Sequence, residues 1–230
     1  MRLVVFDLDG TLTRTNAVDG ECFVLAVSEA LEMTALDRNW DGYDHVTDEG
    51  IIRELYSRRL GRHPEANETA RIVDRFMDLL STRHASDTSR FSQVEGASAF
   101  VEELRDRGWG IALATGAWRR SAEFKIQRAD LPISDLPAAY AEDGPSREGI
   151  VRAAIERAAV RYEQTQFERV ISVGDALWDV KTARKLRIPF LGIADGTKAK
   201  ALQDSGATHT VEDYRDPQRC LRYLEEAEAP

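Results

Sequence analysis

Hydrophobic and polar positions alternate in a regular way from residue 96 to the end of the chain. Short apolar runs predict buried strands at 110–116, 138–142, 169–175, 189–195 and 207–213. Between them, apolar residues at helical spacing predict helices at 97–107, 118–129, 147–160, 177–186, 198–204 and 217–227. Strands that alternate with helices and are apolar on both faces are typical of an α/β fold, in which a parallel sheet is covered on both sides.

Residues 15–90 do not follow this alternation, although an apolar run near residue 4 predicts one more strand before them. The segment has no strand pattern, and its apolar residues predict three helices. We therefore predict a core formed by 1–14 and 91–230, with a helical insert at 15–90 directly after the first strand. The polar stretch 84–93 is expected to be the linker that returns to the core.

Carboxylates follow two of the predicted strands. The first strand continues into "VVFDLDGTLT", in which Asp7 and Asp9 are two residues apart and therefore share a direction if the strand continues. Asp175 follows the strand that begins at residue 169, and Asp179 lies one helical turn later. Because ligands bind beyond the carboxyl ends of parallel strands, we expect these four acids to converge at one edge of the sheet.

The small-residue turn that ends the predicted strand at 110–116 adds Thr115 and Gly116 to the same edge. Each of these polar residues alone has an ordinary explanation as a helix cap, a turn residue or a solvated acid. Their occurrence together at three strand ends favours a site. Oxygen ligands in a chain without His or Cys ligand spacing indicate a hard cation such as Mg²⁺. One carboxylate is then available as a nucleophile and another for proton transfer.

Composition excludes several other classes of protein. The formal net charge of −9 argues against a nucleic-acid partner and against attraction to anionic membranes. No apolar run approaches the roughly 20 residues of a membrane span, and the first residues do not resemble a signal peptide. The two cysteines, Cys22 and Cys220, are far apart and have no spacing typical of zinc ligands. We predict a cytoplasmic protein that is a monomer or a homodimer.

Four short segments together resemble the haloacid dehalogenase (HAD) superfamily, in its phosphatase branch. They are "DLDGT" at 7–11, "ATG" at 114–116, a basic residue at Arg147, and "GDALWD" at 174–179. The helical insert resembles the C1 cap of phosphoglycolate phosphatase-like and β-phosphoglucomutase-like members. The resemblance implies a Rossmann-like core with this cap closing over the site.

The resemblance also implies a role for each residue of the motifs. Asp7 corresponds to the nucleophile and to a magnesium ligand. Asp9 corresponds to the general acid and base, and its backbone carbonyl to a further ligand. Thr115 and Gly116 match the phosphate-binding turn. The remaining implied ligands are Asp175 and, directly or through water, Asp179.

The third motif departs from the family pattern, which most often has Lys. Arg147 occupies this position at the start of a predicted helix, and Arg can bind a phosphoryl oxygen and a carboxylate together. The chain is rich in Arg and has only five Lys, which makes such a replacement reasonable. Lys125, on the helix after "ATG", is the rival candidate for this cation, and a solvated first-turn residue is the third reading of Arg147.

These residues predict a Mg²⁺-dependent phosphatase that hydrolyses a small phosphorylated metabolite through an aspartyl phosphate. A phosphomutase of the same superfamily and a non-catalytic binding or regulatory member remain alternatives. Asp9 argues against a dehalogenase, and the absence of Lys before position 125 argues against a phosphonatase that uses a cap lysine. Candidates for substrate specificity are Asn16, Asp19 and Arg53, each of which could also be a solvated helix residue.

Overall fold

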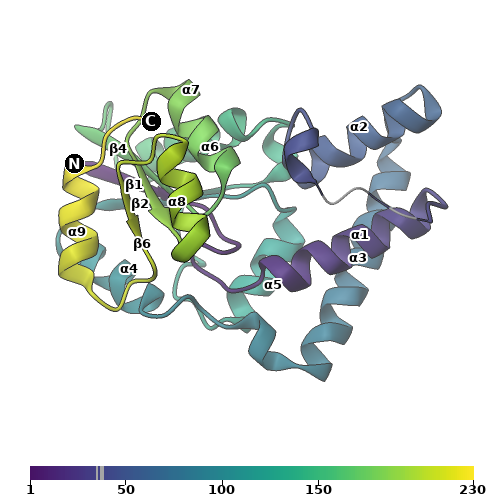
Figure 1. Cartoon of the computed structure of the whole chain (residues 1–230), viewed down its shortest axis with the longest axis horizontal. Coiled ribbons are helices and arrows are strands. Elements are labelled where there is room, and N and C mark those ends of the chain that lie inside the picture. The colour runs from purple at the N-terminus through teal and green to yellow at the C-terminus, as the bar shows by residue number, and fades with distance from the viewer. Residues whose placement is uncertain (35, 37–38) are drawn as a thin grey trace.

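A six-stranded parallel sheet forms the centre of one half of the molecule (Figure 1). The computed structural model describes residues 1–34, 36 and 39–230. The strands are ordered β3-β2-β1-β4-β5-β6. Their bounds are β1 Arg2–Phe6, β2 Gly110–Ala114, β3 Ala138–Ala139, β4 Arg169–Gly174, β5 Phe190–Ile193 and β6 His209–Val211. The predicted α/β fold with a parallel sheet is confirmed.

Helices cover both faces of the sheet because successive side chains of each strand point to opposite faces. Val4 and Phe6 of β1 belong to an apolar cluster with the first set of helices, and Leu3 and Val5 pack on the opposite face. The first set is α4 (Ala97–Asp106), α5 (Arg119–Arg128) and α9 (Pro217–Glu226). The second is α6 (Arg147–Arg161), α7 (Leu177–Leu186) and α8 (Gly196–Asp204).

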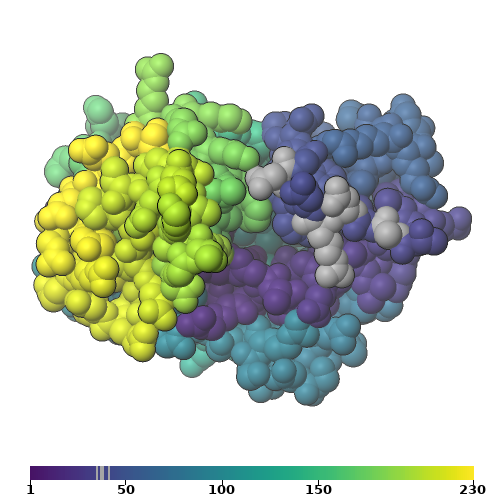
Figure 2. Space-filling view, viewed as in Figure 1, coloured from purple at the N-terminus to yellow at the C-terminus, as the bar shows by residue number. Residues whose placement is uncertain are grey.

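In the residues that the structure describes, three α-helices and no strand form the other half of the molecule (Figure 1). They are α1 (Asn16–Ala30), α2 (Asp48–Leu60) and α3 (Ala66–Ser86). Phe23, Ile52 and Phe76 belong to their shared apolar cluster, which also includes Trp118 of the sheet-bearing half. The two halves therefore pack against each other, side by side in the space-filling view (Figure 2).

Two predicted segments differ in the structure. The expected linker at 84–93 begins later, because α3 continues to Ser86 and a 3₁₀ turn follows at Thr88–Phe91. The expected strand at 138–142 has only two residues and is followed by a 3₁₀ turn at Ala141–Asp143. The Asp143 carboxylate accepts the Tyr140 N–H at 2.9 Å, and Arg157 donates to both Asp143 and the Ala138 carbonyl. β3 is an edge strand, so these side chains bond backbone groups on its outer side, while the Ala141 N–H still donates to the Ala117 carbonyl at 3.0 Å.

The order of the strands positions the site. From the central β1 the chain moves first to β2 and β3 on one side and then to β4, β5 and β6 on the other. Such a reversal leaves a crevice at the carboxyl ends of the central strands. The three motifs with polar residues follow β1, β2 and β4, which are neighbours in the sheet. In the part of the chain that the structure describes, no helix has the length and apolar character needed to cross a membrane.

Candidate active site

Three buried carboxylates lie together at the carboxyl ends of β1 and β4. Asp7, Asp175 and Asp179 each offer an oxygen atom, and these atoms lie within 4.8 Å of one another. The Asp179 side chain is fixed by the chain itself, because its Oδ2 accepts the N–H groups of Asp175 and Ala176, each at 3.1 Å. The chain thus brings the first and last motifs together, but Asp9, the fourth acid expected to converge here, is not part of this cluster.

The environment of this cluster suits a cation. Burial raises the pKa of Asp7 well above its usual range, and the charge of Asp179 raises it further. Burial also raises the pKa of Asp175, and it raises that of Asp179 to about 6. Asp175 Oδ2 accepts hydrogen bonds from Asn16, at 3.0 Å, and from Lys198, but its Oδ1 is buried and has no partner among the described residues. Clustered, incompletely bonded carboxylates of this kind are the oxygen ligands that Mg²⁺ takes.

Arg147 connects the cluster to the helical half. Its Nη1 donates to Asp7 Oδ1 at 3.0 Å and to Asp179 Oδ1 at 3.1 Å, and its Nε donates to the Val46 carbonyl at 2.8 Å. Burial by itself would lower the pKa of this guanidinium, but Asp7 and Asp179 outweigh it and the pKa is raised. Arg147 is therefore the cation in contact with Asp7, and Lys125 is not.

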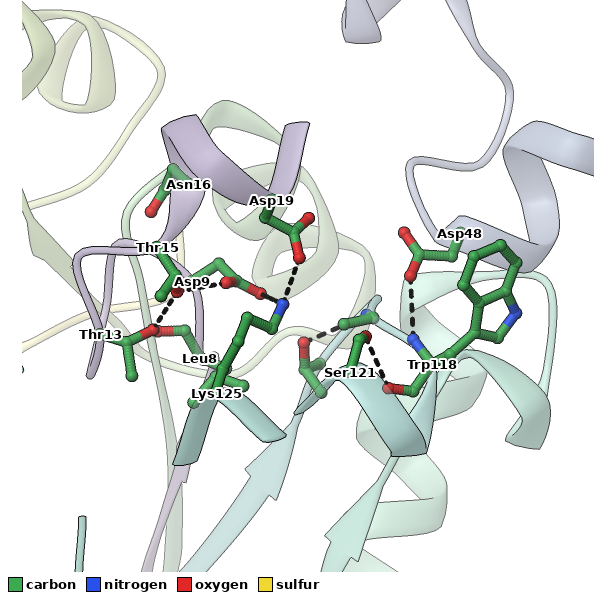
Figure 3. Close-up of polar contacts among 12 residues, drawn as sticks. Leu8, Asp9, Thr13, Thr15, Asn16, Asp19, Asp48, Trp118, Ser121 and Lys125 are labelled. Carbon is green, nitrogen blue, oxygen red and sulfur yellow. Dashed lines mark hydrogen bonds and ion pairs between the residues drawn. The ribbon is translucent and has the colours of Figure 1, made fainter. Parts of the chain in front are cut away.

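Lys125 instead contacts Asp9 and the helical half (Figure 3). Its fully buried Nζ lies 2.6 Å from Asp9 Oδ2 and 2.5 Å from Asp19 Oδ1. Thr15 Oγ1 donates to the other oxygen of Asp9 at 2.5 Å. Burial would lower the pKa of Lys125, but Asp19 and Asp9 outweigh it and the pKa is raised. The two acids of "DLDGT" thus have separate cations, Arg147 for Asp7 and Lys125 for Asp9.

The pKa of Asp19 is raised despite this ion pair. Burial raises the pKa of its carboxyl to about 6, although Lys125 acts in the opposite direction. Asp19 belongs to α1 and Lys125 to α5, so this ion pair joins the two halves of the molecule.

Two glycines are required by the close packing of the loops around these acids. Gly10 has a φ of +82°, and a Cβ there would lie 2.1 Å from Asp175 Oδ2. A Cβ at Gly116 would lie 2.9 Å from Arg147 Nη2. The glycines of "DLDGT" and "ATG" therefore allow one loop to approach the acidic cluster and the other to approach the guanidinium.

Two backbone N–H groups in the turn between β2 and α5 already have hydrogen-bond partners within the protein. The Ala117 N–H donates to Thr115 Oγ1 at 3.2 Å, and the Trp118 N–H donates to Asp48 Oδ2 at 2.9 Å. Thr115 accepts through its hydroxyl oxygen, so the hydroxyl hydrogen stays available for a ligand.

A short segment before α2 is hydrogen-bonded to this turn and to the loop before α6. The Asp48 N–H donates to the Gly116 carbonyl at 2.8 Å, and Thr47 Oγ1 donates to the Pro145 carbonyl at 2.8 Å. Thr47 also caps α2 by accepting the Gly50 N–H at 2.9 Å. The pattern Thr-Asp-Glu indicates a helix start in the sequence, but nothing in it indicates contact with the core.

A cavity of about 120 Å³ lies between the two halves. Among the predicted residues, Asp7, Asp9, Thr115, Gly116 and Arg147 line it, as do the specificity candidates Asn16 and Asp19. Arg53 does not line it; this side chain is about half exposed and paired with Glu49. Residues that the sequence did not single out complete the lining: Gly20, Phe23, Trp40, Val46, Thr47, Asp48, Ile51, Ala117 and Trp178.

The sequence matches the model of one protein family over most of its length. The sequence model of haloacid dehalogenase-like hydrolases matches residues 1–187. No curated protein sequence matches the chain.

Several solved structures share the fold along nearly their whole length. A hydrolase from Pseudomonas syringae is 20% identical, with a TM-score of 0.72, 98% of this chain covered and 99% of the other. A β-phosphoglucomutase from Clostridium difficile is 14% identical, with a TM-score of 0.67 and coverages of 97% and 95%. A protein described as a predicted phosphatase from Clostridium acetobutylicum is 17% identical, with a TM-score of 0.64 and coverages of 96% and 98%.

Proposed function

Because the chain belongs to the haloacid dehalogenase-like hydrolase family, we propose that it is a Mg²⁺-dependent phosphatase acting on a small phosphate monoester. One observation carries this proposal. Asp7 lies in a buried cluster of three carboxylates next to Arg147, and Asp9 is held two residues away by a different cation, Lys125. Two adjacent acids with separate partners suit separate roles, one as nucleophile and one in proton transfer.

In the proposed reaction an oxygen of Asp7 attacks phosphorus, and the bond between phosphorus and the ester oxygen breaks. The departing oxygen takes a proton from Asp9. A water molecule then attacks the aspartyl phosphate, Asp9 takes the proton of that water, and the bond between phosphorus and Asp7 breaks to release phosphate. Both oxygens of Asp9 have partners in the structure, so the contact with Thr15 or Lys125 is exchanged for the substrate oxygen during proton transfer.

The other residues of the cavity bind and orient the phosphoryl group in this proposal. Arg147 and the Thr115 hydroxyl donate to phosphoryl oxygens, together with the Gly116 N–H. The carboxylates of Asp7, Asp175 and Asp179 and the Asp9 carbonyl would hold Mg²⁺. Bound Mg²⁺ neutralises negative charge on the phosphoryl oxygens.

We further propose that residues 15–90 act as a cap over a core formed by 1–14 and 91–230. The contacts of Val46, Thr47 and Asp48 with the loops of the core support this division of roles. A cavity of about 120 Å³ between the two parts suits a small substrate. A cytoplasmic location and a monomeric or homodimeric state stay predictions from the sequence.

Phosphate release from p-nitrophenyl phosphate tests the proposed function. We expect activity with Mg²⁺, loss of activity in excess chelator, and no activity in Asp7→Asn. Phosphate release that persists unchanged in excess chelator would contradict the magnesium site. Conversion of a sugar phosphate into its isomer without phosphate release would favour the phosphomutase alternative.

A further inference from the structure

Among the described residues that line the cavity, carboxylates outnumber cations. Asp9, Asp19 and Asp48 line it, and Lys125 is hydrogen-bonded to the first two. Asp48 accepts the Trp118 N–H, and within the described residues it is neither hydrogen-bonded nor ion-paired to any cation. Among the described residues no cation contacts this carboxylate, although the charge of Lys125 acts to lower its pKa without a hydrogen bond.

Asp48 is buried, with 8% of its surface exposed, and it lines the cavity. One of its oxygens accepts the Trp118 N–H, and Figure 3 shows the other turned away from Trp118, toward the side on which Asp19 lies. Burial and the charge of Asp19 raise the pKa of Asp48 well above its usual range. An unpaired carboxylate in such a place is costly, and a ligand that brings a positive charge would remove this cost.

Aromatic rings border the same space. Phe23, Trp40 and Trp178 line the cavity, and the Arg147 guanidinium already lies over the Trp178 ring, 5.6 Å from its centroid. In the described part of the chain, no Lys or Arg lies over the rings of Phe23 or Trp40. The faces of aromatic rings attract cations, most strongly where water is excluded.

Among the described residues, the cations that contact the cavity acids already have carboxylate partners. Lys125 is bound to Asp9 and Asp19, and Arg147 is bound to Asp7 and Asp179. A leaving group with its own carboxylate would meet Asp48, and among the described residues that line the cavity it would find no cation without a carboxylate partner. A neutral alcohol would give the Asp48 carboxyl no cation to pair with.

We propose, on the premise of the phosphatase function above, that the substrate is an aminoalkyl phosphate, a phosphate monoester whose alcohol carries an ammonium group. The ammonium binds between Asp48 and the aromatic side of the cavity formed by Phe23 and Trp40, and the phosphoryl group binds at Asp7 and Arg147. Asp48 is thus a residue that determines specificity for the leaving group.

Three esters of similar size test this proposal: 2-aminoethyl, 2-hydroxyethyl and carboxymethyl phosphate, which end in a positive, a neutral and a negative group. A charge-assisted hydrogen bond corresponds to about tenfold or more in affinity. We therefore expect kcat/KM for 2-aminoethyl phosphate to exceed that for 2-hydroxyethyl phosphate by about tenfold or more, with carboxymethyl phosphate lowest. Equal values for the three esters, or a preference for the carboxymethyl ester, would overturn the proposal.

The variant Asp48→Asn isolates the charge, since the amide oxygen can still accept the Trp118 N–H. The preference for 2-aminoethyl over 2-hydroxyethyl phosphate is expected to fall about tenfold in this variant. Asp44→Asn is the matched control, because Asp44 is an exposed acid on the same segment and does not line the cavity. It should keep the preference of the unaltered protein. A preference that survives in Asp48→Asn contradicts the role of Asp48.

A binding measurement on the unaltered protein needs neither turnover nor a variant. With Mg²⁺ present, calorimetry should show that 2-aminoethylphosphonate binds about tenfold or more tightly than propylphosphonate, which has the same shape without the charge. Equal binding of the two overturns the inference. Selective binding without hydrolysis of any ester, p-nitrophenyl phosphate included, supports the ammonium site and rejects the phosphatase function. Hydrolysis of p-nitrophenyl phosphate without selective binding does the reverse.

Discussion

Replacing Lys125 by Met removes the ammonium that joins Asp9 and Asp19 and keeps an unbranched side chain of similar length. The Nζ is fully buried and lies 2.6 Å from Asp9 and 2.5 Å from Asp19. Without it, two carboxylates less than a fifth exposed face each other with no cation between them.

The expected loss follows from the burial of this ion pair. Removing one partner of a buried ion pair typically costs about 3–5 kcal/mol, because the remaining charge is left uncompensated. Asp19 can relieve part of this cost by taking a proton, since burial already raises its pKa to about 6. We therefore expect the free energy of unfolding to fall by about 3 kcal/mol at neutral pH, and by less near pH 5. The double variant Lys125→Met/Asp19→Asn, which removes one of the two acids, should recover about 1 kcal/mol or more of this loss.

Urea unfolding followed by circular dichroism measures these differences. Lys200→Met is the matched control, because Lys200 Nζ lies 3.2 Å from Asp204 Oδ1 in an ion pair and 75% of the Lys200 side chain is exposed. An exposed pair of this kind contributes about 0–1 kcal/mol. If Lys125→Met lost no more free energy of unfolding than Lys200→Met, Lys125 would not be the buried link between the two halves that its contacts describe.

Three further variants address the proposed roles of single residues. Asp9→Asn should lower kcat by about 10²–10⁴-fold at saturating Mg²⁺, because the amide cannot transfer a proton; unchanged kcat would assign proton transfer to another group. Arg147→Ala should abolish most turnover in phosphate-release assays, because Asp7 and Asp179 lose their shared cation, and Arg147→Lys should restore part of it. If Lys is no better than Ala, the paired geometry of the guanidinium matters more than its charge. The pKa of Asp19 is raised from 3.8 to about 6 in the folded protein, which means that folding favours the protonated carboxyl. The contribution of this protonated form to the free energy of unfolding is therefore complete below about pH 4 and is lost as the pH rises through 6. Relative to Asp19→Asn, the unaltered protein should therefore lose about 2 kcal/mol of unfolding free energy between pH 4.5 and 6.5, and a flat difference would refute the raised pKa.

Sequence patterns predicted the sheet and the convergence of the acids for a physical reason. Strand and helix periods are local properties, and the carboxyl ends of neighbouring parallel strands meet at one edge whatever the details of packing. Asp7, Asp175 and Asp179 could therefore be grouped before their distances were known. The shortened β3 was not predictable, because it is an edge strand whose outer backbone groups are bonded by the side chains of Arg157 and Asp143.

Several contacts between side chains far apart in the sequence were not visible in its local patterns. Lys125 was the rival candidate for the cation of the third motif, but its ammonium contacts Asp9, 116 positions earlier in the chain, and not Asp7. Asp48 reads as a first-turn acid of α2, and its contact with Trp118 depends on how the helical half sits on the core. Lys198 likewise reaches Asp175 from α8. Such contacts depend on tertiary packing, and no local period encodes them.

Trapping the covalent intermediate tests whether Asp7 is the nucleophile. The protein is mixed with p-nitrophenyl phosphate and Mg²⁺, quenched in acid during turnover, reduced with borohydride and digested for mass spectrometry. Reduction of an aspartyl phosphate converts that residue into homoserine, so we expect homoserine at position 7 and at no other carboxylate. The same treatment of Asp7→Asn should give none. Phosphate release without homoserine at position 7, or homoserine at Asp9 instead, would contradict the proposed nucleophile.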